Sequence, residues 1–188
     1  MKIRFVHACI AGAIAISSCW SLGASASPET AASSLAAPDR AAGLLKAVRE
    51  ATARFHDIEN AKAAGYGLFL GCVSGHDEGA MGVHYVNLDY VNDPALDATK
   101  PEALIYESVN GRMQLIAVEF VVIAEAWDTA NPDVAPVLMG QSFQYTESPN
   151  RYRLPAFYDL HVWAWKDNPN GTYVEFNPDV SCEDYNPD

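Results

Sequence analysis

The chain has 188 residues, of which 49% are hydrophobic and 19% are charged, and its formal net charge is −12 at pH 7. Single domains commonly have about 100–150 residues, so the length predicts one domain with a buried core. The acidic balance excludes a protein that holds nucleic acid or anionic lipid through a basic surface, because phosphate groups repel such a chain. Metal cations and neutral small molecules are left as ligands.

The first 26 residues have the pattern of a bacterial signal peptide. Lys2 and Arg4 precede an apolar run, residues 5–16, which is too short to span a bilayer. Cleavage after Ala26 is expected to export a soluble protein to the periplasm or the medium, with 10 basic against 24 acidic residues and a net charge of −14. Alternatively, residues 16–19 resemble a lipobox, which predicts a lipid anchor on Cys19. No later segment is apolar enough for a transmembrane helix.

Residues 27–38 are rich in Ala, Ser and Pro and are predicted to form a flexible leader, which places a single α+β domain at residues 39–188. Apolar residues then recur at steps of three and four from Leu44 to Ile58, the pattern of an amphipathic helix. Asp57 is placed to cap a second, short helix that Gly65 ends. The two helices predict an N-terminal helical hairpin.

Reactive side chains are concentrated in residues 71–87, GCVSGHDEGAMGVHYVN. They are Cys72, His76, Asp77, Glu78 and His84. The glycines of this stretch allow backbone conformations that side chains forbid, so we expect a loop wrapped around a ligand or an ion. Residues 81–88 alternate as in a strand, which places His84 on the same side as the apolar Val86.

The cysteines predict one disulfide. Cys9 lies in the signal peptide, and Cys19 is either removed with it or lipidated. Cys72 and Cys182 are then the pair left in the exported domain, and an oxidising compartment favours a bond between them. Closing so long a loop stabilises the fold by about 4–5 kcal/mol in the chain-entropy model.

A β-hairpin is the clearest local structure in the sequence. Residues 103–108 and 113–124 are rich in strand-forming side chains, and Asn110-Gly111 between them is a strong signal for a two-residue turn. The predicted pairs are Ser108 with Met113, Tyr106 with Leu115, and Leu104 with Ala117. Alternation places Glu119 on one face with Leu115, Ala117, Val121 and Ile123. A carboxylate buried there needs a partner, a proton or a metal ion; otherwise that face turns to solvent.

The last long strand is predicted at residues 157–165, where His161 shares a face with Asp159, Trp163 and Trp165. Short strands are also expected near residues 137–139 and 142–145. We therefore predict a twisted antiparallel sheet of about five to seven strands, against which the N-terminal helical hairpin packs.

Several familiar motifs are absent from the sequence, which has no Walker loop, no GxGxxG opening a βαβ unit, no GxSxG and no HExxH. Two segments, GAMGVHYVN at residues 79–87 and LHVWAWKDNPNG at residues 160–171, are followed by NPDVSC ending at Cys182. Together they resemble a group of exported bacterial proteins that is uncharacterised. The resemblance implies no activity, cofactor or catalytic residue.

The residues with the clearest chemical meaning are His84, Glu119 and His161. Two imidazoles and one carboxylate from three strands are a common ligand set for zinc, copper, iron or manganese, and they leave coordination positions open for water or substrate. His76 is a candidate for a fourth ligand. This pattern predicts a metal site and assigns no reaction.

Two alternatives do without a metal ion. In one, the protein binds a small molecule in an apolar pocket lined by Tyr85, Trp163 and Trp165. His84, Glu119 and His161 would then orient the ligand by hydrogen bonds. In the other, the protein is a partner-binding lipoprotein, which requires lipid attachment at Cys19.

Overall fold

The computed structural model describes residues 37–186, so the predicted signal peptide, Cys19 and nearly all of the predicted leader lie outside the described residues. Its helices are α1 (Ala37–Thr52), η2 (Ala53–His56), α2 (Ile58–Ala63), α3 (Leu88–Val91) and α4 (Ala124–Ala130). Asp57 caps α2 by accepting a hydrogen bond from the backbone N–H of Glu59, and Gly65 follows that helix with a φ of +92°. The arrangement of the N-terminal helices as a hairpin stays a prediction.

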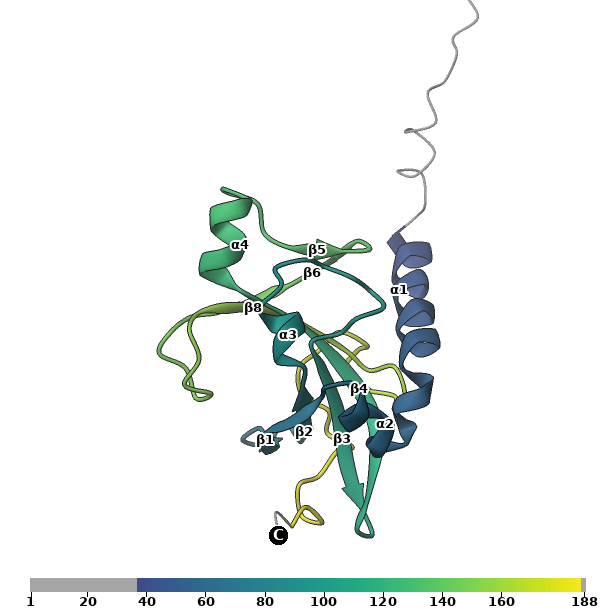
Figure 1. The fold of residues 1–188 in the computed structure, drawn as a ribbon. Coiled ribbons are helices and arrows are strands. Elements are labelled where there is room, and N and C mark those ends of the chain that lie inside the picture. Colours follow the sequence, from purple (N-terminus) through teal and green to yellow (C-terminus); the bar gives the residue numbers. More distant parts are fainter. Residues whose placement is uncertain (1–36, 187–188) are drawn as a thin grey trace, which may run out of the picture. The chain divides into compact units, whose positions relative to one another are not determined.

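Six strands form an antiparallel sheet in the described part of the chain, in the order β1-β2-β3-β4-β8-β7. They are β1 (Gly67–Ser74), β2 (Ala80–Val86), β3 (Ala103–Val109), β4 (Arg112–Ile123), β7 (Gln144–Thr146) and β8 (Phe157–Val162). A separate pair consists of β5 (Val137–Leu138) and β6 (Gln141–Ser142). The sheet is strongly curled, as Figure 1 shows, and the predicted α+β class with an antiparallel sheet is confirmed.

The strand predicted at residues 81–88 is confirmed as β2, but the first part of the glycine-rich stretch is strand β1 and not a loop, so the two form a β-hairpin. β1 pairs with β2 from Gly67 opposite Val86 to Ser74 opposite Ala80, and three register shifts interrupt the ladder. Only the short connection between Ser74 and Ala80 is a turn. Glycines inside a strand commonly mark such irregular pairing, because they lack a side chain to pack.

The hairpin of β3 and β4 is confirmed at its turn and differs from the prediction farther along. Asn110 and Gly111 have φ values of +51° and +72°, as a tight two-residue turn requires, and Tyr106 pairs with Leu115 as expected. A bulge between Ile105 and Tyr106 then shifts the register by one residue, so that Leu104 lies opposite Val118 instead of Ala117.

The bulge also divides the side chains of β4 between the two faces of the sheet. Leu115 joins Val118 and Phe120 in the core beneath the helices, whereas Ile116 and Ala117 belong to a second core on the opposite face. The prediction that Leu115 shares a face with Glu119 was therefore wrong. Ala117, Val121 and Ile123 do alternate with the helix-facing residues, in the same phase as Glu119.

The N-terminal helices contribute to the larger core. Leu44 and Val48 of α1 are completely buried in one cluster with Leu104, Phe120 and Val162 of the sheet. Polar contacts reinforce this packing: the hydroxyl of Tyr106 donates to the carbonyl of Phe55 at 2.7 Å, and Arg49 Nε donates to the carbonyl of Ala164 at 2.7 Å.

The C-terminal segment, residues 163–186 after β8, contributes to the second core, where its Trp163 and Val180 pack with Ile105. The predicted disulfide joins Cys72 of β1 to Cys182 of this segment, across a sequence separation of 110 residues. Asn177 forms a two-way backbone bridge with Ala80. A Cβ atom on the neighbouring Gly79 would lie 2.0 Å from the carbonyl oxygen of Asn177, so only glycine fits here.

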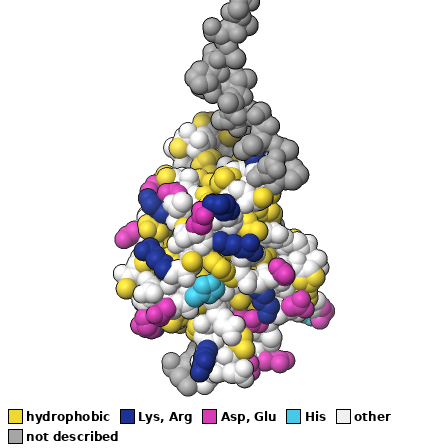
Figure 2. Space-filling model, turned by 90° about the vertical axis from the view of Figure 1, so that its right-hand side faces the viewer, with side chains coloured by type: hydrophobic (Ala, Val, Ile, Leu, Met, Phe, Trp, Pro, Cys, Tyr) yellow, Lys and Arg dark blue, Asp and Glu magenta, His cyan; other side chains and the backbone are white. Residues whose placement is uncertain are grey.

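On the face of the domain that carries α1, positively and negatively charged side chains are interspersed with apolar ones, as Figure 2 shows. Among the described residues, no helix combines the length and the apolar character needed to cross a membrane.

Candidate metal centre

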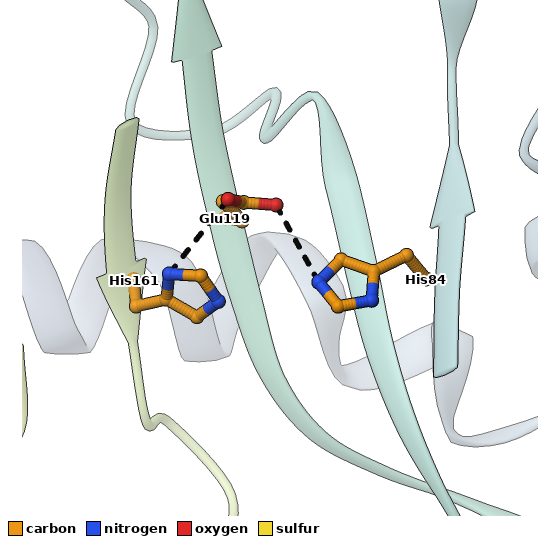
Figure 3. A group of neighbouring side chains, drawn as sticks. All are labelled: His84, Glu119 and His161. Atoms are coloured by element: carbon orange, nitrogen blue, oxygen red, sulfur yellow. Dashed lines mark ion pairs between the residues drawn. The ribbon is translucent and has the colours of Figure 1, made fainter. Parts of the chain in front are cut away.

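His84, Glu119 and His161 converge on the face of the sheet opposite α1, although 77 residues separate the first from the last. His161 of β8 lies directly opposite Glu119 of β4, and β3 separates β4 from β2, which carries His84. Figure 3 shows the three side chains pointing toward one space. One ligand atom from each residue lies within 4.8 Å of the other two.

The distances around Glu119 are too long for direct hydrogen bonds. Its Oε2 lies 3.7 Å from His84 Nε2, and its Oε1 lies 3.7 Å from His161 Nδ1. A tetrahedral ion with bonds of about 2.1 Å would separate its ligand atoms by roughly 3.4 Å. Both nitrogen–oxygen distances exceed this separation by a few tenths of an ångström, although they run to different oxygens of Glu119. With the one-atom-per-residue separations within 4.8 Å, rotation of the side chains by about an ångström would reach coordination geometry, so the residues present fit a metal ion.

The imidazole of His84 is oriented by its own strand. Its Nδ1 lies 3.2 Å from the carbonyl oxygen of Gly82, which can only accept, so Nδ1 carries the proton. Burial lowers the pKa of His84 to about 3, and the neighbouring His161 adds to that effect, so the ring is neutral. Its Nε2 lone pair therefore faces the carboxylate of Glu119, an unfavourable pairing unless a proton or a cation lies between them.

His161 is completely buried, and neither of its ring nitrogens has a hydrogen-bonding partner among the described residues. Its Nδ1 lies 3.7 Å from Asp159 Oδ2, a buried oxygen that is likewise unpaired within the described part of the chain. Burial opposes protonation of His161, but the carboxylates of Glu119 and Asp159 outweigh that effect and raise its pKa. Buried polar atoms without a partner destabilise a fold, so a bound proton or cation that pairs the atoms of this cluster would be stabilising.

Glu119 is buried at the centre of the cluster. Burial raises its pKa to about 7, because a carboxylate loses hydration in the interior, and the attraction of His161 only partly offsets that loss. A divalent cation would compensate the buried negative charge and accept the lone pairs of both imidazoles.

Asp159 is the functional candidate that the sequence did not single out. It lies two residues before His161, so it projects from the same face of β8, and this alternation was the available signal. Its Oδ1 accepts a hydrogen bond from the Thr146 hydroxyl at 3.3 Å, which leaves Oδ2 directed at His161. Asp159 and Glu119 thus face the same ring nitrogen, Nδ1, so Asp159 adds a second carboxylate beside the ligand atom of His161.

The other predicted site residues lie elsewhere. His76 is exposed and pairs with Asp77 at 2.8 Å, and it is not part of the cluster. Tyr85 packs against Tyr106 in the core beneath the helices, with ring centroids 5.4 Å apart. Trp163 lies in the second core and donates its indole N–H to the carbonyl of Val174.

Trp165 also departs from the predicted face of the last strand. Because β8 ends at Val162, the chain turns, and the Trp165 indole N–H donates to the Thr52 hydroxyl at the end of α1. None of the three predicted aromatic residues contributes to the pocket beside the cluster.

That pocket has a volume of about 140 Å³ and opens onto two of the three candidate ligands, His84 and Glu119. Its remaining lining is apolar or aromatic: Phe69, Leu70, Val86, Leu88, Val91, Ala103, Val121, Ile123, Tyr152, Leu154 and Phe157. Phe69 and Leu88 are also among the exposed large hydrophobic residues, which is consistent with a pocket open to solvent. No local sequence pattern marks this lining, because its residues come from separate strands and loops.

No protein-family model, no curated protein and no solved structure matches this chain. The residues of the site and their geometry are therefore the basis for a functional conclusion.

Proposed function

We propose that this exported protein binds a divalent transition metal ion through His84, Glu119 and His161. The observation that carries the proposal is the convergence of two imidazoles and a carboxylate in the protein interior. Both ring nitrogens of His161 lack a hydrogen-bonding partner among the described residues. A cation would relieve the conflict between the His84 lone pair and the Glu119 carboxylate, and it would give one of the two ring nitrogens of His161 a partner.

The ligand set favours zinc, copper, iron or manganese over calcium or magnesium, because imidazole nitrogen suits these transition metals and hard alkaline-earth ions prefer oxygen. Three protein ligands leave at least one coordination position open, as in catalytic sites. Bound metal without turnover would indicate a metal-binding module, and turnover that requires the ion would indicate an enzyme.

Export is part of the proposal. The disulfide between Cys72 and Cys182 is compatible with an oxidising compartment, and no helix of the described residues could span a membrane. Location in the periplasm or the medium, or lipid attachment at Cys19, depends on the N-terminal residues.

The second candidate is a metal-free module for a small molecule, and the apolar pocket beside His84 and Glu119 is the observation in its favour. In that case, the two side chains would offer hydrogen bonds to the ligand. The two candidates differ in whether native protein contains a stoichiometric ion.

Elemental analysis of protein purified from the export compartment without chelators tests the proposal. We expect close to one transition metal ion per wild-type chain and a loss of most of it in His84→Ala and in His161→Ala. His76→Ala is the matched control: it removes an exposed imidazole outside the cluster, so its metal content should equal that of wild type.

Metal-free wild type that also fails to take up Zn²⁺ or Co²⁺ on dialysis would overturn the proposal, as would metal retained in both cluster variants. Circular dichroism and free-thiol counting check that each variant is folded with its disulfide formed. Cobalt absorption spectra then report the coordination number of the bound ion.

A further inference from the structure

The pocket beside the candidate metal centre combines an apolar lining with very few polar groups. Among its lining residues, only His84, Glu119 and Tyr152 carry polar side-chain atoms, and there is neither lysine nor arginine. A site of this kind suits a ligand with an apolar body and one polar head, because the body gains by leaving water and the head must meet the polar end.

We infer that this pocket takes a small apolar molecule with a single metal-ligating head group, which completes the coordination of the ion held by His84, Glu119 and His161. The inference rests on the proposed function and goes further by naming the class of ligand. It follows from the position of the pocket, which borders two of the three metal-ligand candidates.

The volume limits the apolar body. A cavity of about 150 Å³ lined by aliphatic and aromatic side chains is known to bind benzene, so a pocket of about 140 Å³ accommodates one six-membered ring or a short branched chain. The pocket is open at the side of Phe69 and Leu88, so substituents on the ring could project past these residues toward solvent.

The charges limit the head group. Without an ion, the carboxylate of Glu119 would repel a ligand anion, and the lining provides no basic side chain to compensate. With an ion in place, oxygen or nitrogen donors such as a hydroxamate or an imidazole gain a coordination bond.

Tyr152 provides the remaining polar contact. Burial raises its pKa to about 12, so its hydroxyl stays protonated and can donate to a ligand oxygen. In the structure that hydroxyl lies 3.8 Å from Met81 Sδ, a weak acceptor, so a ligand could replace this contact with little loss.

The test uses two hydroxamates with the same head. Benzohydroxamic acid carries a phenyl ring, and acetohydroxamic acid carries a methyl group in its place. Calorimetric titration of both into zinc-loaded full-length mature protein measures what the ring adds. We expect benzohydroxamic acid to bind at least tenfold more tightly, because its ring enters the apolar pocket.

Two variants assign this preference to the pocket. Val121→Phe extends a half-buried pocket side chain into the space for the ring and should reduce the preference to about twofold or less, with the metal content unchanged. Val137→Phe is the matched control, since Val137 is exposed and lies outside the lining. Leu88→Ala removes an exposed lining side chain, which spares the core, and should weaken the preference by about threefold.

The outcomes separate the inference from the proposed function. If wild-type protein binds zinc but then binds both hydroxamates with equal affinity, the proposed metal site stands and the inference about the pocket is overturned. A preference that survives both Val121→Phe and Leu88→Ala would place the ring elsewhere and also overturn it. Failure to bind zinc at all, measured before any ligand is added, would reject the proposed function itself.

Discussion

Glu102 offers a sharp test of how this fold buries charge. It lies directly before β3, is only 2% exposed, and its Oε2 accepts a hydrogen bond from the backbone N–H of Val121 at 2.9 Å. Burial raises its pKa from 4.5 to about 8, because hydrogen bonds from the backbone offset only part of the lost hydration of the carboxylate, and the charges of Glu119 and Asp93 add to the shift. The substitution Glu102→Gln keeps the shape of the side chain and an acceptor oxygen but cannot ionise.

The pKa shift fixes both the sign and the size of the expected effect. A folded-state pKa above the unfolded value means that folding favours the protonated acid, so stability is highest below pH 4.5 and is lost as the pH rises to about 8. Each pKa unit corresponds to about 1.4 kcal/mol, which makes the full difference roughly 5 kcal/mol as an upper limit. We expect Glu102→Gln to match wild type near pH 4.5 and to exceed its stability by about 3–5 kcal/mol at pH 9.

Urea unfolding of metal-free protein with its disulfide intact measures this difference at several pH values. Glu125→Gln is the matched control, because Glu125 is exposed in the first turn of α4 and should show no comparable trend. A stability difference between Glu102→Gln and wild type that stays constant from pH 5 to pH 9 would refute the reasoning. So would destabilisation of the variant at high pH, since it would mean that the carboxylate is better stabilised than its burial implies.

Two further predictions concern the metal site and the fold that supports it. Asp159→Asn keeps an acceptor for Thr146 but removes a negative charge beside His161 Nδ1, so zinc affinity should fall by about 10- to 100-fold in competition with a chromophoric chelator. An unchanged affinity would show that the Asp159 carboxylate does not support the site. Gly79→Ala should lower the free energy of unfolding by about 2–5 kcal/mol in urea, because the added Cβ would lie 2.0 Å from the carbonyl oxygen of Asn177 and the φ of residue 79 is +85°. A decrease below about 1 kcal/mol would mean that the C-terminal segment moves away from residue 79 at little cost.

Features that depend on neighbouring residues, or on counting residues of one type, could be predicted from the sequence. Asn110-Gly111 specified the turn of the β3–β4 hairpin, because both positions require positive φ, and the register counted from that turn paired Tyr106 with Leu115 correctly. Cys72 and Cys182 were identified as a disulfide by elimination, without knowledge of the fold. These inferences succeeded because each rests on local geometry or on chemistry that does not depend on strand order.

Which distant residues lie close together could not be predicted, because it depends on how the strands are ordered in the sheet. The bulge after Ile105 moved Leu115 to the helix-facing core, and no residue pattern marked it in advance. The pairing of β4 with β8 set Glu119 opposite His161 across more than 40 residues of chain, and the order of β2, β3 and β4 brought His84 to the same place. Strand order depends on the packing of the whole domain, so the convergence of His84, Glu119 and His161, the position of Asp159 beside His161 and the lining of the pocket follow from the folded chain alone.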